Sequence, residues 1–257
     1  MKKFYLFATL VVLISNVASA QYRLLLRNES FTPEKNISVA GVAELNRKKI
    51  SLNRKSFVII QFEGIPTESE TRELKENGIQ LLDYIPNNAY TATTTGTISA
   101  SALQRVRARS VIELSARQKM QVSLANGNFP AHAVKVAGTL DVWVSFPKTF
   151  SFQEVSDELR NKSFSITSDL FKNYGVLELR IPVGRIGELA LLPFVQYIQA
   201  APKQDIPVND HSTVNARANV LGSSVSGNRN LHGEGVVIGI GDNSDPLLHV
   251  DFTNRII

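Results

Sequence analysis

One order of strand-like and helix-like segments occurs twice along the 257 residues, and it constrains the fold more than any other feature. Ser56 to Phe62 is rich in β-branched and aromatic residues, which predicts a strand. Pro66 precedes Thr67 to Glu70, whose acidic residues predict the first turn of a helix. Further elements are expected over residues 79–85, 89–95, 99–108 and 111–114. The first copy therefore has the order β-α-β-β-α-β.

The second copy has the same order. Its strands are expected over residues 140–146, 163–169, 175–181 and 194–198, and its helices over residues 151–159 and 182–193. Matching first strands lie roughly 84 residues apart, from Phe57 to Asp141, which suits two tandem domains rather than a solenoid. Each copy predicts a small antiparallel sheet with two helices on one face, the ferredoxin-like arrangement of the α+β class. Many activities use this fold, so the fold alone does not indicate a function.

The N-terminus has the features of a secretory signal peptide. Two lysines are followed by an apolar run over residues 4–14, and Ala18-Ser19-Ala20 supplies small residues before Gln21. The apolar run is shorter than the roughly 20 residues that span a bilayer, so a cleaved leader is favoured over a membrane anchor. We expect cleavage between Ala20 and Gln21 and a mature protein that is secreted, or at the cell surface or in the periplasm, without membrane attachment.

Composition excludes several classes of site. The chain has no cysteine, which excludes disulfides, thiol catalysis and cysteine-based zinc sites. Its 43% hydrophobic content is enough for a packed core, which must therefore stabilise the fold. The net charge of +5 is low, and the basic runs are not interleaved with aromatic residues, so no nucleic-acid partner is expected.

Three stretches resemble the subtilisin-like serine proteases, the subtilases. SFVIIQFEGIP from Ser56 and LKENGIQLLDYIPNNAYTA from Leu74 resemble the family's N-terminal pro-region, in which a Y-I-I-Q-F strand precedes a helix, a glycine and Y-I-P-x-N-A-Y. LRIPVGRIGELALLPFVQYIQ from Leu179 resembles the end of such pro-domains. LHGEGVVIGIGDNSDPLLHVDFTNRII from Leu231 resembles the start of the catalytic domain.

The last stretch carries the chemistry that the resemblance implies. The family phrase G-x-G-V-x-I-x-I-x-D places Asp242 on the aspartate of the Ser-His-Asp triad, and Gly233 and Gly235 on the turn before the first core strand. Residues 236–240 form an apolar run suited to a buried parallel strand. Asp242 follows at the end of that strand where α/β sheets build their sites, and could orient a catalytic imidazole.

The supporting loop follows the family pattern only in part. His249 and Asp251 match an H-x-D pair in the loop after the strand, and this histidine is not the triad base. Asn243 and Ser244 stand where the family has Ser or Thr and then Gly, so the backbone of this loop is expected to differ locally.

Other interpretations of this segment remain open. Asp242, Asp245, His249 and Asp251 could bind a metal ion, although their spacing matches neither an EF-hand nor a helical zinc motif. The two glycines could belong to a dinucleotide loop, but that fingerprint follows a strand, whereas these precede one. The polar run could also be a simple turn.

The expected divisions follow from these observations. They are a signal peptide over 1–20, a linker or weakly ordered arm over 21–55, pro-domain modules over 56–120 and 138–201, a linker or processing region over 202–230, and the start of a truncated subtilase domain over 231–257. After Asp242, the chain offers only His249 and Ser244 as a base and a nucleophile, too close to Asp242 for triad geometry. The 257 residues alone are therefore expected to be inactive.

Two functions of different classes are consistent with this organisation. The first is the front portion of a secreted serine endopeptidase precursor that acts on protein or peptide substrates, with a pro-region that packs on its own catalytic domain. No cofactor is evident in the sequence, and a calcium site is suggested only by the family resemblance. The second is a non-catalytic inhibitor or chaperone of a subtilase. A structural cell-surface module is a third, weaker interpretation.

Overall fold

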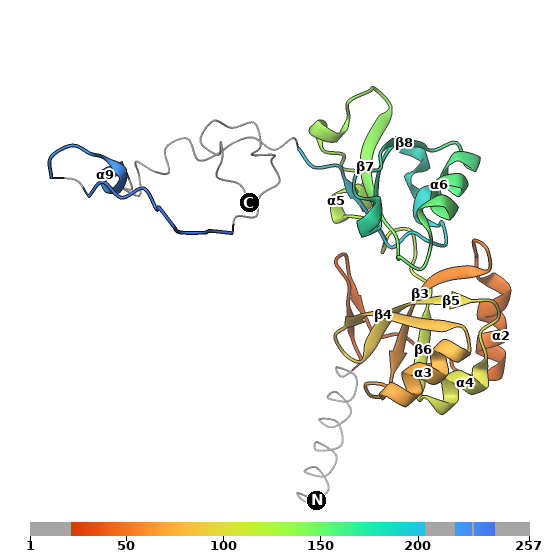
Figure 1. The fold of residues 1–257 in the computed structure, drawn as a ribbon. Coiled ribbons are helices and arrows are strands. Elements are labelled where there is room, and N and C mark those ends of the chain that lie inside the picture. The colour runs from red at the N-terminus through yellow and green to blue at the C-terminus, as the bar shows by residue number, and fades with distance from the viewer. Residues whose placement is uncertain (1–21, 204–218, 228, 240–257) are drawn as a thin grey trace, which may run out of the picture. The chain divides into compact units, whose positions relative to one another are not determined.

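The computed structural model describes residues 22–203, 219–227 and 229–239 (Figure 1). The chain divides into two compact units, residues 1–203 and 204–257, which are described separately. The described part of the first unit contains two four-stranded sheets and one two-stranded hairpin, in which the paired strands run antiparallel. The α+β class expected from the sequence is therefore confirmed.

The first sheet has the strand order β4-β5-β3-β6. Its strands are β3 (Lys55–Phe62), β4 (Ile79–Ile85), β5 (Ala89–Thr95) and β6 (Ala108–Ile112). All residues of β3 from Ser56 to Phe62 are buried, because both faces of the sheet are covered. Val58 and Ile60 point to one core, while Ile59 points to a second core on the opposite face.

Two helices connect the strands of this sheet, α3 (Glu68–Glu76) and α4 (Ala100–Arg105) (Figure 1). A capping box starts α3, in which the backbone N–H of Thr67 donates to Glu70 Oε2 at 2.7 Å. The helix ends before Gly78, whose φ of +77° suits a residue without a side chain. Leu74 of α3 and Leu103 of α4 are fully buried in the core that Val58 and Ile60 share.

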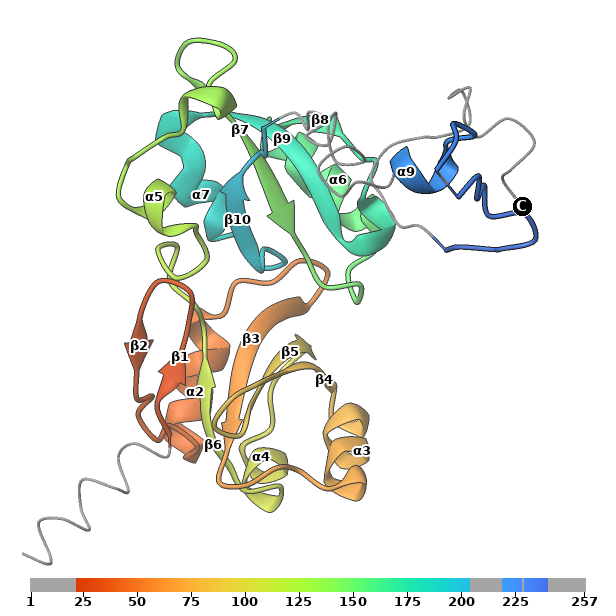
Figure 2. The same cartoon turned by 90° about the vertical axis from the view of Figure 1, so that its left-hand side faces the viewer.

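Residues 24–48 differ from the weakly ordered arm that the sequence predicts. They form the hairpin β1 (Leu24–Leu25) and β2 (Ser30–Phe31) and the helix α2 (Val39–Lys48) (Figure 2). Leu24 is buried against Ile59 and Ala89 on the face of the sheet opposite α3 and α4. Val42 joins the core on the helical face. Leu24 and Val42 thus pack this largely polar segment against both faces of the sheet.

The second sheet has the strand order β10-β7-β9-β8. Its elements are β7 (Thr139–Ser145), α6 (Phe152–Asn161), β8 (Ser165–Ser168), η2 (Lys172–Tyr174), β9 (Val176–Pro182), η3 (Val183–Arg185), α7 (Ile186–Ala190) and β10 (Tyr197–Ala200). Alternate residues of β7, Leu140, Val142 and Val144, are buried in one core with α6 and α7. Asp141 and Trp143 lie on the other face, opposite the one that packs on α6 and α7.

The segment between the two sheets, residues 113–138, also forms short helices and pairs with the second sheet. It holds α5 (Val122–Ala125) and η1 (Ala131–Ala133). Met120 forms a parallel bridge with Ile198 at the β10 edge, where the backbone N–H of Ile198 donates to Lys119 O at 2.7 Å. This pairing protects one edge of the second sheet.

The last strand of each module is displaced from its expected position. β6 begins at Ala108 rather than at residue 111, and β10 begins at Tyr197 rather than at residue 194. Phe194 and Val195 are fully buried but lie in a turn, in which the backbone N–H of Val195 donates to Leu192 O at 3.1 Å. An apolar loop that enters the core has the same composition as a buried strand, so the sequence does not separate the two.

In the second unit, the described residues include the short helix α9 (Asn219–Gly222). Residues 236–239, where the sequence predicts a buried strand, are not in a strand. Val236, Val237 and Ile238 have exposed fractions of 63%, 77% and 71%. In the described ranges, this segment has no neighbouring strand to pair with, and an isolated strand is not stable. Among those same ranges, no helix is long and apolar enough to cross a membrane.

Candidate functional site: a cleft between two sheets

The two glycines expected before the catalytic strand lie in the described residues. Gly233 and Gly235 have φ angles of +74° and +78°, and the backbone N–H of Val236 donates to Gly233 O at 3.0 Å. This geometry is a turn, and the residues that follow it, 236–239, are not in a strand. The remaining predicted site residues lie outside the described residues: Asp242, Asn243, Ser244, His249 and Asp251. Their arrangement stays a prediction, as does the cleavage point before Gln21.

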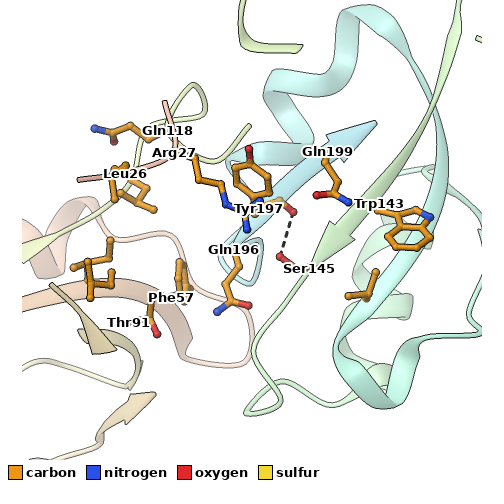
Figure 3. Close-up of a pocket in the computed structure, with 14 residues that line it drawn as sticks. Leu26, Arg27, Phe57, Thr91, Gln118, Trp143, Ser145, Gln196, Tyr197 and Gln199 are labelled. Carbon is orange, nitrogen blue, oxygen red and sulfur yellow. Dashed lines mark hydrogen bonds between the residues drawn. The ribbon is translucent and has the colours of Figure 1, made fainter. Parts of the chain in front are cut away.

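A cleft in the first unit is the other candidate site, with a volume of about 440 Å³ (Figure 3). One wall comes from the first module and includes Phe57, Ile59 and Thr91. The facing wall comes from the second module and includes Trp143 and Tyr197. Strand alternation explains this placement, because these residues lie on the sheet faces opposite the helices. The cleft thus forms where these two sheet faces meet.

The cleft has a largely apolar lining with a few polar groups. Arg27 lies just after β1, and its guanidinium carbon lies 4.7 Å from the centroid of the Tyr197 ring. A cation over an aromatic face is favourable, so this contact holds Arg27 at the cleft. Gln196 and Gln199 come from the turn before β10 and from β10 itself. Ser145 on β7 donates to the backbone oxygen of Tyr197 at 3.4 Å, the dashed contact in Figure 3.

Direct contacts between the two modules hold the walls of the cleft together. The backbone N–H of Phe57 donates to Pro193 O at 2.8 Å. Lys55, two residues earlier on the same face of β3, forms an ion pair with Glu154 at 3.0 Å. Thr93 and Thr149 share a hydrogen bond of 2.6 Å between their hydroxyl groups. These contacts attach the strands of the first sheet to the start of α6 and to the loop before β10.

Among the residues in these contacts, Glu154 has a carboxyl pKa that is shifted far from its ordinary value. Burial raises the pKa of its carboxyl, but hydrogen bonds from the Ser151 backbone, Asn53, Lys55 and the Ser151 hydroxyl outweigh burial and lower the pKa to about 2. The backbone N–H of Ser151 donates at 2.8 Å as part of the capping box of α6. One carboxylate therefore both starts a helix and joins two modules.

A polar network lies on the open face of the second sheet, beside Trp143. Arg180 donates two hydrogen bonds to Asp141, at 2.7 and 2.8 Å, and Lys135 lies 3.2 Å from the same carboxylate. These bonds hold the pKa of Asp141 below its usual range. The indole N–H of Trp143 donates to Glu178 at 3.2 Å. The bidentate contact orients Arg180 and Asp141, and the hydrogen bond to Glu178 orients the Trp143 indole.

A second polar cluster surrounds a buried amine that contacts the second module. Lys119 is 5% exposed, and its ammonium donates to Leu192 O at 3.3 Å. Burial lowers the pKa of Lys119 to about 8, and the charge of Glu113 opposes that shift. Burial likewise raises the pKa of Glu113. The described residues contain no group of three or more His, Cys, Asp or Glu side chains that could hold a metal ion.

Sequence reasoning missed the cleft. Trp143 and Tyr197 are expected to be packing residues, and Arg27 falls in the segment expected to be an arm. His132, for which the sequence suggests no role, has its Nε2 3.1 Å from Ala201 O. One sequence pattern could have indicated the cleft. Asp141, Trp143 and Ser145 occupy alternate positions of a strand, so they form one partly polar face.

Residues 25–115 match the model of a family described as a domain of unknown function, DUF8729. The matched range begins within β1 and ends after β6, so it spans the hairpin, α2 and the first sheet. No curated protein and no solved structure matches the chain.

Proposed function

We propose that this chain is the N-terminal portion of the precursor of a secreted subtilisin-like serine endopeptidase. The observation that carries the proposal is the phrase from Gly233 to Phe252, which combines the glycine turn, the apolar run, Asp242 and the H-x-D-F sequence. The positive φ angles of Gly233 and Gly235 support it, because that phrase requires a turn before its strand.

The proposed chemistry is acyl transfer through a serine. Asp242 would accept a hydrogen bond from the imidazole of the catalytic histidine, fix its tautomer and stabilise the imidazolium that forms when it takes the serine proton. The family places that histidine and serine further along the chain than Asp242. Residues 1–257 would supply only the aspartate of the triad.

We further propose that both modules are ferredoxin-like and together form the pro-region. Each has the element order β-α-β-β-α-β, and both sheets place the first strand between the third and fourth. Two separate hydrophobic cores within residues 22–203 support a region that folds before the catalytic domain. The compact unit ends at Lys203, within the segment 202–230 expected to contain the processing site.

The direct test is to sequence the source DNA beyond codon 257 and to assay the encoded protein. We expect the frame to continue into segments resembling H-G-T-x-V-A and G-T-S-x-A. In the full-length parent, Asp242→Ala should lower peptidase activity on the order of 10⁴-fold, while the matched Asp245→Ala should leave most activity. An immediate stop codon, or full activity of Asp242→Ala, would refute the proposal.

The second candidate is a free inhibitor or chaperone of a subtilase, favoured by the two hydrophobic cores whose described members all lie within residues 22–203. The purified 257-residue protein should then inhibit a subtilisin-like protease tightly and speed its refolding. If a stop codon follows residue 257 and no inhibition occurs, both functions are excluded. N-terminal sequencing of the exported protein tests the signal peptide, and a first residue other than Gln21 would contradict the expected cleavage point.

A further inference from the structure

We propose that the cleft between the two sheets binds the C-terminal end of a peptide whose last residue is apolar. This inference goes beyond the proposed function and rests only on residues of the first unit. The volume of the cleft, about 440 Å³, lies within the range typical of small-ligand sites. Such a volume suits a few residues of chain rather than a folded partner.

The walls favour an apolar side chain. Phe57 and Ile59 form one side, and Trp143, Val176 and Tyr197 form the other. Phe57 and Ile59 are almost fully buried, while Trp143 and Tyr197 are half-buried, so an occupant would cover the remaining aromatic surface. Burying apolar ligand surface between two aromatic walls is favourable.

The charge of the cleft favours a carboxylate. Arg27 is the one charged residue among those that line it. The described part of the chain gives Arg27 no ion pair within 4.0 Å, and its guanidinium is held over Tyr197 instead. A guanidinium offers a planar fork of donors that matches a carboxylate. A neutral apolar ligand would leave that fork without a partner.

The amide side chains distinguish a peptide from other apolar carboxylates. Gln196 and Gln199 line the cleft, and neither side-chain amide hydrogen-bonds to another of the lining residues (Figure 3). Each amide can donate and accept, which is the pairing that a peptide group requires. A fatty acid carries a carboxylate and an apolar chain but has nothing to satisfy the two amides. The combination of one cation, two amides without a partner among the lining residues, and aromatic walls therefore points to a peptide end.

The chain contains its own probe for this proposal. Trp143 is the only tryptophan, so its fluorescence reports on the cleft without labelling. The 257-residue protein would be titrated with acetyl-Ala-Ala-Phe bearing a free carboxylate, with the same peptide amidated, and with dodecanoate. Calorimetric titration in parallel detects binding that does not alter the emission.

We expect saturable binding of the free-acid peptide and binding of the amidated peptide that is about tenfold weaker, as for loss of one charged hydrogen bond. Arg27→Gln should weaken the free-acid peptide about tenfold and leave the amidated peptide unchanged. Gln199→Leu should weaken both peptides. The matched control is Arg72→Gln, since Arg72 is exposed on α3 and does not line the cleft. The Arg72→Gln variant should bind both peptides with the affinity of the unchanged protein.

Several outcomes would overturn the proposal. They are equal affinity for acid and amide, unchanged affinity after Arg27→Gln, tighter binding of dodecanoate than of the peptide, and no binding by either method. Circular dichroism of each variant checks that the fold is retained. The proposed protease function can fail independently, because its test depends on Asp242 and on coding sequence beyond residue 257.

Discussion

Replacing Glu154 by glutamine should weaken the attachment between the two modules, and the structure gives the magnitude. Glutamine keeps an oxygen that can accept the capping hydrogen bond from Ser151 but removes the charge that pairs with Lys55. The pKa of Glu154 falls from its ordinary 4.5 to about 2. At 1.36 kcal/mol for each pKa unit, the native state stabilises the ionised form by about 3 kcal/mol. Both side chains of the pair are less than one-third exposed, so solvent screens the pair only in part.

The sign of the pH dependence follows from the direction of the shift. A carboxyl whose pKa is lower in the folded state stabilises the fold above its unfolded pKa. That contribution is complete above about pH 5 and is lost as the pH falls from about 4.5 to about 2. We therefore expect Glu154→Gln to lower the free energy of unfolding by about 3 kcal/mol at pH 7. The difference from the unchanged protein should shrink progressively below pH 4.5.

Urea denaturation at a series of pH values measures this difference. Glu70→Gln is the matched control, because Glu70 occupies the same position in the capping box of α3 but pairs with the exposed Arg107 within one module. We expect a smaller cost there. A Glu154→Gln cost below about 1 kcal/mol at pH 7, or a cost that does not change between pH 7 and pH 3, would refute the reasoning. A double-mutant cycle with Lys55→Met should assign only part of this energy to the pair, because the Ser151 backbone and Asn53 also donate hydrogen bonds to Glu154.

Three further perturbations test other parts of the first unit by the same denaturation assay. The free energy of unfolding should rise between about pH 8 and pH 10.5, because the folded state prefers neutral Lys119, and Lys119→Met should abolish that rise. Asp141→Asn should cost about 3 kcal/mol at pH 7 by leaving Arg180 without its carboxylate, and a cost within error of zero would contradict the network. Gly175→Ala should cost more than Gly138→Ala, because both have positive φ but only at Gly175 would the added carbon lie 2.3 Å from a backbone oxygen. Equal losses of unfolding free energy in the two variants would contradict this, because they would mean that the backbone near Gly175 shifts to accommodate the added carbon.

The sequence predicted the order of elements within each module well. Strands with dense β-branched and aromatic content, such as Ser56 to Phe62, coincide with β3 to within one residue. The helices that begin with a capping box, after Thr67 and Ser151, also begin where expected. These elements depend mainly on residues that are close in sequence, so their positions can be predicted without knowledge of the tertiary structure.

Elements that depend on distant partners were not predictable. The hairpin containing Leu24 is two residues long in each strand, and its order comes from packing against Ile59 rather than from any local pattern. The apolar run at residues 236–239 satisfies the pattern of a buried strand, yet it lacks pairing among the described residues. The cleft was hidden for the same reason, since Arg27 and Tyr197 meet across 170 residues of chain.

The cleft and the contacts that hold it share one strand face. On β3, Lys55 pairs with Glu154 while Phe57 and Ile59 line the cleft, and the backbone N–H of Phe57 donates to the second module. Because side chains alternate along a strand, these three residues point the same way and cannot move independently. Loosening the Lys55–Glu154 pair should therefore widen the cleft as well as destabilise the unit. Glu154→Gln should weaken peptide binding even though Glu154 does not line the cleft, whereas Glu70→Gln should not. The two modules would then act as one binding unit, in which stability and ligand affinity depend on the same ion pair.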